Sequence, residues 1–163
     1  MTVKVIVIQW NIKGESGLGI DMKWDIRFLN LADHISTWSR DPSTKTGSVI
    51  VNDKRHIISV GYNGFPVGIE DKKEWYNDRE TKLKFICHAD RNALDNAYSS
   101  VEGCDMYITH SPCMECQKSI IQKRIKRVIF WKPTEEWTKK WGEPELLKYS
   151  GITCLPITKE YHK

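Results

Sequence analysis

The chain has 163 residues, of which 40% are hydrophobic and 28% charged, as expected for one globular domain with one sizeable core. Its net charge of +4 is too small to indicate a dedicated nucleic-acid binder, but it is compatible with a small anionic substrate. Five Cys, an odd number, and apolar runs far too short to span a bilayer argue against a disulfide framework and a membrane protein. No signal peptide is visible, so we expect a cytoplasmic protein.

The first third of the chain predicts an extension, a helix and a hairpin. Residues 1–21 contain a strand-like run at 2–10 and a glycine-rich linker at 14–19, and we assign this extension no role. Residues 22–163 form the domain. Between 24 and 40, apolar residues recur at alternating steps of four and three, which predicts an amphipathic helix that Asp41 and Pro42 end. The runs 48–51 and 56–62, joined by a polar turn, predict a β-hairpin. The expected buried stripe of the helix is Trp24, Phe28, Leu31, Ile35 and Trp38.

The rest of the chain alternates helices and strands. Residues 61–68 hold three glycines and a proline, which predicts a loop whose backbone can approach a ligand closely. We expect the charged stretch at 70–84 to pack over this loop with its charges facing solvent. The later patterns predict helices at 90–98, 115–124 and 134–149, the last interrupted near Gly142 and Pro144, and strands at 106–109, 127–131 and 152–156. This order predicts an α/β three-layer sandwich, with a central mixed sheet of about five strands flanked by helices.

The strongest chemical signal is one His followed by a Cys-x-x-Cys pair. His88 precedes one predicted helix, and Cys113 and Cys116 begin the next. Helix N-termini carry partial positive charge that stabilises thiolates, the form of Cys that binds zinc. Three protein ligands leave one tetrahedral position for water, whose pKa zinc lowers to about 7. We therefore predict a catalytic Zn²⁺ site, with the carboxylate of Asp90 beside it.

Two simpler sites use the same residues. A Cys-x-x-Cys pair in a cytosolic chain also fits a redox pair or half of a structural zinc site. A closed structural site needs a fourth ligand, for which the chain offers Cys87, Cys104, Cys154 or His110. Without such a role, the three additional Cys are expected to be small buried apolar side chains.

The motifs also carry a resemblance. His-x-Glu followed by Pro-Cys-x-x-Cys is the signature of the zinc deaminases, and His88 to Asp90 and Pro112 to Cys116 match it with Asp in place of Glu. The chain resembles the cytidine deaminase superfamily over about residues 22–156. Residues 38–47 and the sequence Gly-Tyr-Asn-Gly-Phe-Pro-Val-Gly at 61–68 are similar to the deoxycytidylate (dCMP) deaminases, including those of phages. The resemblance implies hydrolysis of dCMP to dUMP and ammonia, which supplies dUMP for dTMP synthesis, in the host cytoplasm if the chain is phage-encoded.

The resemblance also implies roles for single residues. His88, Cys113 and Cys116 hold the zinc, and the water activated there attacks C4 of cytosine. Asp90 takes a proton from that water, delivers it to N3 and later helps to protonate the leaving amine.

The implied substrate contacts lie in three parts of the chain. Arg40 and Lys45 are candidates for the 5′-phosphate, although solvated surface cations are an equally good interpretation of both. The other expected contacts, to the sugar and the base, are Asn63, Asn92, Ser111 and Pro112.

Family resemblance further implies regulation. Members commonly form hexamers and bind dCTP or dTTP with Mg²⁺ as effectors at the Gly-Tyr-Asn-Gly loop. Because Gly61, Tyr62, Asn63 and Gly64 keep this pattern, we expect an allosteric nucleotide site there and a homohexamer.

Asp90 departs from the family pattern. Asp is one methylene shorter than Glu, so its carboxylate starts roughly 1 Å further from the ring, a misplacement that can cost on the order of 100-fold in rate. Three explanations of this Asp are open. The active site has shifted to suit the shorter side chain, the enzyme is weakened, or the chain is a catalytically silent regulatory protein that binds zinc and nucleotides. An editing deaminase is a further alternative, but it requires a basic, aromatic-lined groove. No cationic run precedes the metal motifs, so we expect no nucleic-acid partner.

Overall fold

Five strands form one mixed sheet in the computed structural model, which describes residues 22–159. The strand and linker expected within residues 1–21 lie outside the described residues. The strand at residues 47–51 pairs antiparallel with both of its neighbours, and the two remaining strand pairings are parallel. The order is β2-β1-β3-β4-β5. The strands are β1 (Gly47–Val51), β2 (Ile57–Tyr62), β3 (Asp105–Ile108), β4 (Arg127–Trp131) and β5 (Thr153–Ile157).

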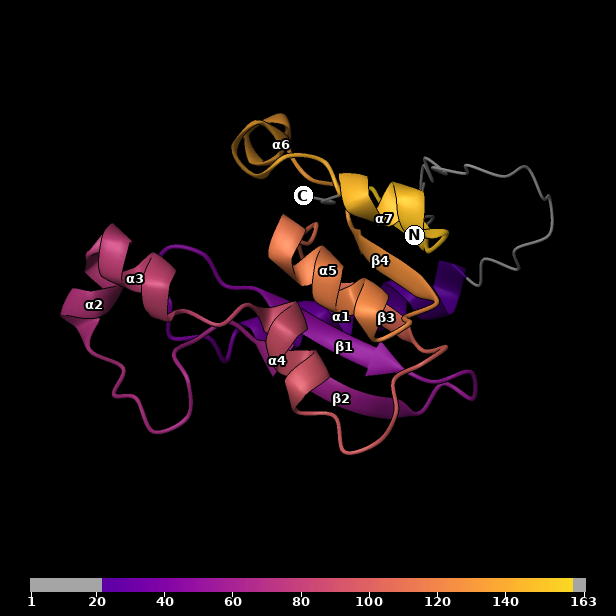
Figure 1. The fold of residues 1–163 in the computed structure, drawn as a ribbon, viewed down its shortest axis with the longest axis horizontal. Helices are drawn as coiled ribbons and strands as arrows, with labels where there is room; N and C mark the ends of the chain where they lie inside the picture. The colour runs from indigo at the N-terminus through magenta and orange to yellow at the C-terminus, as the bar shows by residue number, and fades with distance from the viewer. Residues whose placement is uncertain (1–21, 160–163) are drawn as a thin grey trace.

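Helices cover both faces of the sheet, which gives three layers (Figure 1). On one face α1 (Met22–Ser36) shares a core with Val49 and Ile129. The opposite face carries α4 (Ala89–Asp95), α5 (Met114–Gln122) and α7 (Glu145–Ser150), which bury Met106 and Phe130. The predicted α/β three-layer sandwich with about five strands is confirmed.

The first helix is shorter than predicted. It ends at Ser36, and the Ser36 and Thr37 hydroxyls donate to backbone carbonyls one turn earlier, which favours a helix end. Trp38 therefore falls outside the buried stripe and is 50% exposed, although Phe28 and Ile35 are buried as expected.

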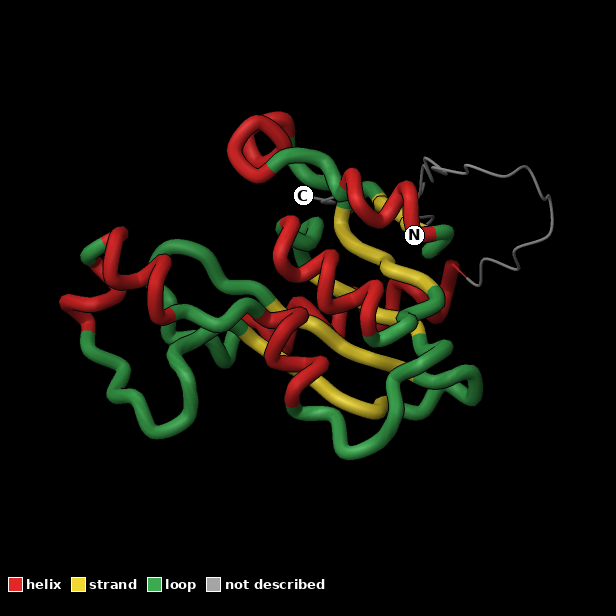
Figure 2. The backbone as a smooth tube through the Cα atoms, in the orientation of Figure 1, coloured by secondary structure: helices red, strands yellow, loops and turns green. Residues whose placement is uncertain are grey.

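Three short helices stand beside the sheet instead of covering it. The charged stretch forms α2 (Lys73–Asn77) and α3 (Arg79–Phe85), and α6 (Glu135–Trp141) precedes α7. Figure 2 shows them as short helical segments between long loops. The predicted helix at 134–149 is divided at Gly142, whose φ of 78° favours glycine. None of the helices within residues 22–159 has the length and hydropathy needed to span a membrane.

One glycine lets α4 lie directly on the sheet. A Cβ atom at Gly61 would overlap the backbone of Ala89 and Ala93, so only glycine permits this spacing between β2 and α4. The N-terminal end of α4, which carries His88 and Asp90, is thereby fixed against the sheet.

Candidate active site

One nitrogen and two sulfur atoms converge where α4 and α5 begin. His88 and Cys113 immediately precede the two helices, and Cys116 lies in the first turn of α5. His88 Nδ1 lies 3.3 Å from Cys113 Sγ and 3.4 Å from Cys116 Sγ. Within residues 22–159, this three-residue group gains no fourth His, Cys or carboxylate ligand. One nitrogen and two thiolates suit Zn²⁺, and three protein ligands keep one tetrahedral position open.

The pKa values of the two thiols are shifted in opposite directions. A hydrogen bond from Cys116 lowers the pKa of Cys113 to about 4, and His88 adds to this effect. The same contact, together with burial, raises the pKa of Cys116. Since zinc binds thiolates, metal binding must release the proton that Cys116 retains.

Asp90 lies beside the metal-ligand group on α4. Its side chain is buried, and its Oδ1 accepts a hydrogen bond from the Arg91 amide at 3.0 Å. Burial raises the pKa of the Asp90 carboxyl, and a hydrogen bond with Cys116 opposes that shift. A carboxyl group in such surroundings suits proton transfer better than an ordinary surface Asp.

A cavity of about 570 Å³ leads from solvent to these residues. His88, Asp90 and Cys113 form its floor, while side chains from α3 and α6 line its exposed end, which we call the mouth. The volume is in the range of small-molecule sites. Expected contacts that also line it are Asn63, Ser111 and Pro112.

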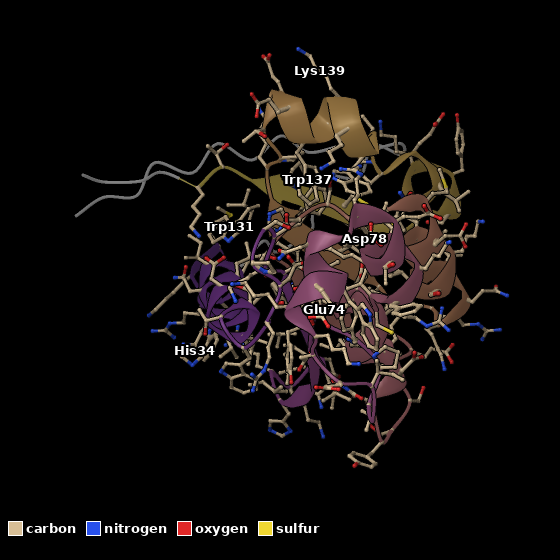
Figure 3. All side chains as sticks on the ribbon, turned by 90° about the vertical axis from the view of Figure 1, so that its left-hand side faces the viewer. His34, Glu74, Asp78, Trp131, Trp137 and Lys139 are labelled. Carbon is tan, nitrogen blue, oxygen red and sulfur yellow. The ribbon has the colours of Figure 1, made fainter. Side chains whose placement is uncertain are left out.

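Aromatic side chains form one wall of the cavity. The rings of His110 and Trp137 lie 4.3 Å apart, and Trp137 Nε1 donates to Ser111 Oγ at 3.1 Å. Burial lowers the pKa of His110, which favours the neutral ring at pH 7. Figure 3 shows Trp137 below α6, between that helix and the segment that carries Asp78. The wall therefore joins α6 to the turn that precedes Cys113.

The side-chain amide of Asn63 hydrogen-bonds to other residues of the protein. Its Oδ1 accepts from the Thr46 amide at 2.8 Å, and its Nδ2 donates to the Thr44 carbonyl at 2.8 Å. Nδ2 also lies 3.4 Å from Asp41 Oδ2. Asn63 thus shapes the 41–46 loop at the cavity edge, and its expected contact with the deoxyribose stays a prediction.

The residues expected to bind an effector tie the glycine-rich loop to the metal-ligand group. Gly64 and Cys87 exchange two backbone hydrogen bonds, at 3.1 and 2.8 Å, directly before His88. Asn92 Nδ2 donates to the Tyr62 carbonyl at 2.8 Å and so joins α4 to the end of β2. Asn92 is outside the cavity lining, and the effector site itself stays a prediction.

Arg40 and Lys45, the expected phosphate contacts, do not line the cavity. Arg40 lies 3.5 Å from Asp71 on the surface, and Lys45 donates to the Ser39 carbonyl. Their phosphate role stays a prediction without support from this placement.

Several residues that shape the site were not predicted from the sequence. Gln117 lies behind the cavity lining, where it is buried and links the Pro112 carbonyl, at 3.0 Å, to the Leu146 amide, at 2.9 Å, which fixes the turn before Cys113. An isolated Gln inside a helix pattern gives no signal of this role. The unexpected residues that do line the cavity with charged or aromatic side chains are Asp41, Tyr76, Arg79, Lys82, His110, Trp137, Lys140 and Trp141.

Known proteins share this arrangement. Residues 22–132 match the family described as the cytidine and deoxycytidylate deaminase zinc-binding region. An uncharacterised deaminase of Aliivibrio fischeri is 42% identical over 142 residues, which are 83% of this chain and 95% of that protein. The deoxycytidylate deaminase of Mus musculus is 37% identical over 87% of this chain and 84% of its own length. The dCMP deaminase of cyanophage S-TIM5 superposes with a TM-score of 0.66 at 25% identity, covering 83% of this chain and 98% of that one. The chain therefore belongs to the cytidine and deoxycytidylate deaminase family.

Proposed function

We propose that the protein catalyses the zinc-dependent hydrolysis of dCMP to dUMP and ammonia. The observation that carries this proposal is the convergence of His88, Cys113 and Cys116 beside a cavity of about 570 Å³. The first two of these residues line the cavity floor together with a buried carboxylate, that of Asp90. The deoxycytidylate deaminase relatives support cytosine nucleotides as the substrate class.

Two groups of residues would have separate roles in this reaction, the zinc ligands and the carboxylate beside them. His88, Cys113 and Cys116 would hold the zinc, which when bound lowers the pKa of water to about 7 and so supplies a nucleophile at neutral pH. Asp90 would take a proton from the attacking water and deliver it to N3 of the base.

The remaining steps break the bond between C4 and its amine. Asp90 would carry the second proton of the water to the leaving nitrogen, so that ammonia departs and C4 keeps the oxygen as a carbonyl. The wall formed by His110 and Trp137 would keep the base against the floor and exclude bulk water.

The test is an assay of the zinc-loaded protein with dCMP, CMP, deoxycytidine and dCTP in parallel, following loss of cytosine absorbance and release of ammonia. We expect dCMP to be the best substrate and Asp90→Ala to abolish turnover. If Asp90→Ala deaminates dCMP as fast as the parent, the role given to Asp90 is wrong.

A silent regulatory protein is the second candidate, because Asp90 stands where the family signature has Glu. It predicts one bound zinc and saturable binding of dCTP or dTTP, with no ammonia released. Control by dCTP or dTTP with Mg²⁺ and a hexameric assembly remain part of the proposal. Hyperbolic dCMP saturation that neither triphosphate changes would exclude such control.

A further inference from the structure

The charged side chains of the cavity are unevenly distributed. Two carboxylates, of Asp41 and Asp90, and three cations, of Arg79, Lys82 and Lys140, line it. Lys82 Nζ lies 2.7 Å from the buried Asp41 carboxylate, so these two charges compensate each other. Asp90 is at the floor, beside the metal-ligand group. The mouth is therefore left with two positive charges, on Arg79 and Lys140.

Neither cation pairs with a carboxylate within residues 22–159. In this part of the chain Arg79 makes no side-chain hydrogen bond or ion pair, and Lys140 makes a cation–π contact with the face of Trp141, at 5.1 Å from the ring centroid. Both side chains belong to exposed residues and still line the cavity. The other two cations of α3 differ, since Lys82 pairs with Asp41 and Lys84 pairs with Glu80, each at 2.7 Å.

The two cations approach the mouth from different parts of the chain. Arg79 begins α3 and Lys140 lies in the last turn of α6, so a ligand between them contacts both helices. The metal-ligand group marks the opposite, buried end. A nucleotide whose base reaches that floor has its phosphate directed toward the exposed end of the cavity.

The geometry points to Arg79 and Lys140 as a clamp for the 5′-phosphate of the substrate. A guanidinium can donate two parallel hydrogen bonds to phosphate, and an ammonium adds a compact positive charge. This assignment rests on the proposed function and replaces Arg40 and Lys45, which bond elsewhere. It makes the two peripheral helices the source of selectivity for nucleotides over nucleosides.

The test compares Arg79→Gln, Lys140→Gln and the double variant with matched controls. Lys84→Gln lies on α3, and Lys139→Gln lies on α6 with its side chain directed away from the rest of the molecule in Figure 3. Turnover of dCMP and deoxycytidine and calorimetric binding of dUMP are measured for each zinc-loaded protein. Because a charge-assisted hydrogen bond of an exposed group contributes modestly, we expect KM for dCMP and Kd for dUMP to rise about tenfold in each single variant and about 100-fold in the double variant.

The ratio of kcat/KM for dCMP to kcat/KM for deoxycytidine should fall by the same factors, and the two control variants should keep the parent's ratio. Arg40→Gln and Lys45→Gln are measured in the same way. Unchanged dUMP affinity in the double variant, or a loss of dUMP affinity only in Arg40→Gln and Lys45→Gln, would overturn the clamp and leave the proposal of dCMP deamination intact. A parent protein that neither deaminates dCMP nor binds dUMP would overturn both proposals.

Discussion

The floor and the mouth of the cavity are built by different means. The floor takes its side chains from the beginnings of α4 and α5, two helices that pack on the sheet. The mouth takes Arg79 and Lys140 from short helices that stand beside the sheet. If both proposals hold, the reacting groups lie on helices that pack on the sheet, and the groups that recognise the phosphate lie on helices that stand beside it. Substitutions at the floor should remove activity, whereas those at the mouth should change affinity or local stability.

The largest effect is expected from Cys116→Ser. Cys116 is a buried member of the metal-ligand group, and a hydroxyl is a poor replacement for a thiolate on zinc. Bound zinc should fall well below one equivalent, and dCMP turnover should drop on the order of 1,000-fold or more. Atomic absorption and the deaminase assay measure both.

Cys87→Ser is the matched control, because Cys87 is a free cysteine next to His88 in sequence yet outside the metal-ligand group. It should keep its zinc. Loss of zinc from this control would instead identify a closed site with four protein ligands.

Asp90→Glu restores the length of the carboxylate side chain found in the family signature. The longer side chain moves the carboxylate roughly 1 Å toward the base, and Asp90 lines the cavity into which the added methylene extends. We expect kcat for dCMP to rise on the order of 100-fold, with KM nearly unchanged because the proposed phosphate clamp is left intact.

The control is Asp95→Glu, which adds the same methylene to an exposed carboxylate of α4 that pairs with Arg91 at 3.0 Å. Its kinetics should match those of the parent. A slower Asp90→Glu enzyme would mean that the floor has moved to suit Asp.

The floor of the cavity could be predicted from the sequence, whereas the mouth could not. His88, Cys113 and Cys116 precede or begin helices, so local spacing was enough to predict that they belong together. The sheet followed in the same way from the alternation of apolar runs, and its five strands lie within one or two residues of those expected.

The mouth carries no comparable signal. Lys82 reaches Asp41 across 41 positions, and Arg79 lines the cavity only because α3 folds back beside the 41–46 loop. A charged stretch such as 70–84 has the composition of a solvated surface, and nothing in its periodicity indicates which cations turn inward. Arg40 and Lys45 were the better candidates by proximity to the nucleotide motifs, yet their hydrogen-bond partners lie elsewhere.

The smallest effect is expected from a substitution that changes an ion pair of the cavity lining and leaves the metal-ligand group intact. Lys82→Met removes the ion pair with Asp41, whose side chain is 1% exposed. Burial raises the pKa of Asp41, but hydrogen bonds from Lys82, Ser43 and Thr44 outweigh burial and hold it below 3.8. In the variant, the Asp41 carboxylate still accepts hydrogen bonds from the backbone amides of Ser43 and Thr44. The free energy of unfolding at pH 7 should therefore fall by about 1–3 kcal/mol, which is less than the loss expected for a buried charge without any partner.

This loss should depend on pH in a defined direction. A carboxyl whose pKa is lower in the folded than in the unfolded state stabilises the fold above pH 3.8, and that contribution disappears as the pH falls through the folded pKa. Urea unfolding at pH 7 and near pH 3 should therefore show the gap between Lys82→Met and the parent closing in acid, with zinc content at pH 7 equal in both. Lys84→Met, which breaks an exposed pair on the same helix, should cost less than about 0.5 kcal/mol. A gap of constant size across this range would mean that Lys82 stabilises the mouth through its aliphatic stem and not through its charge.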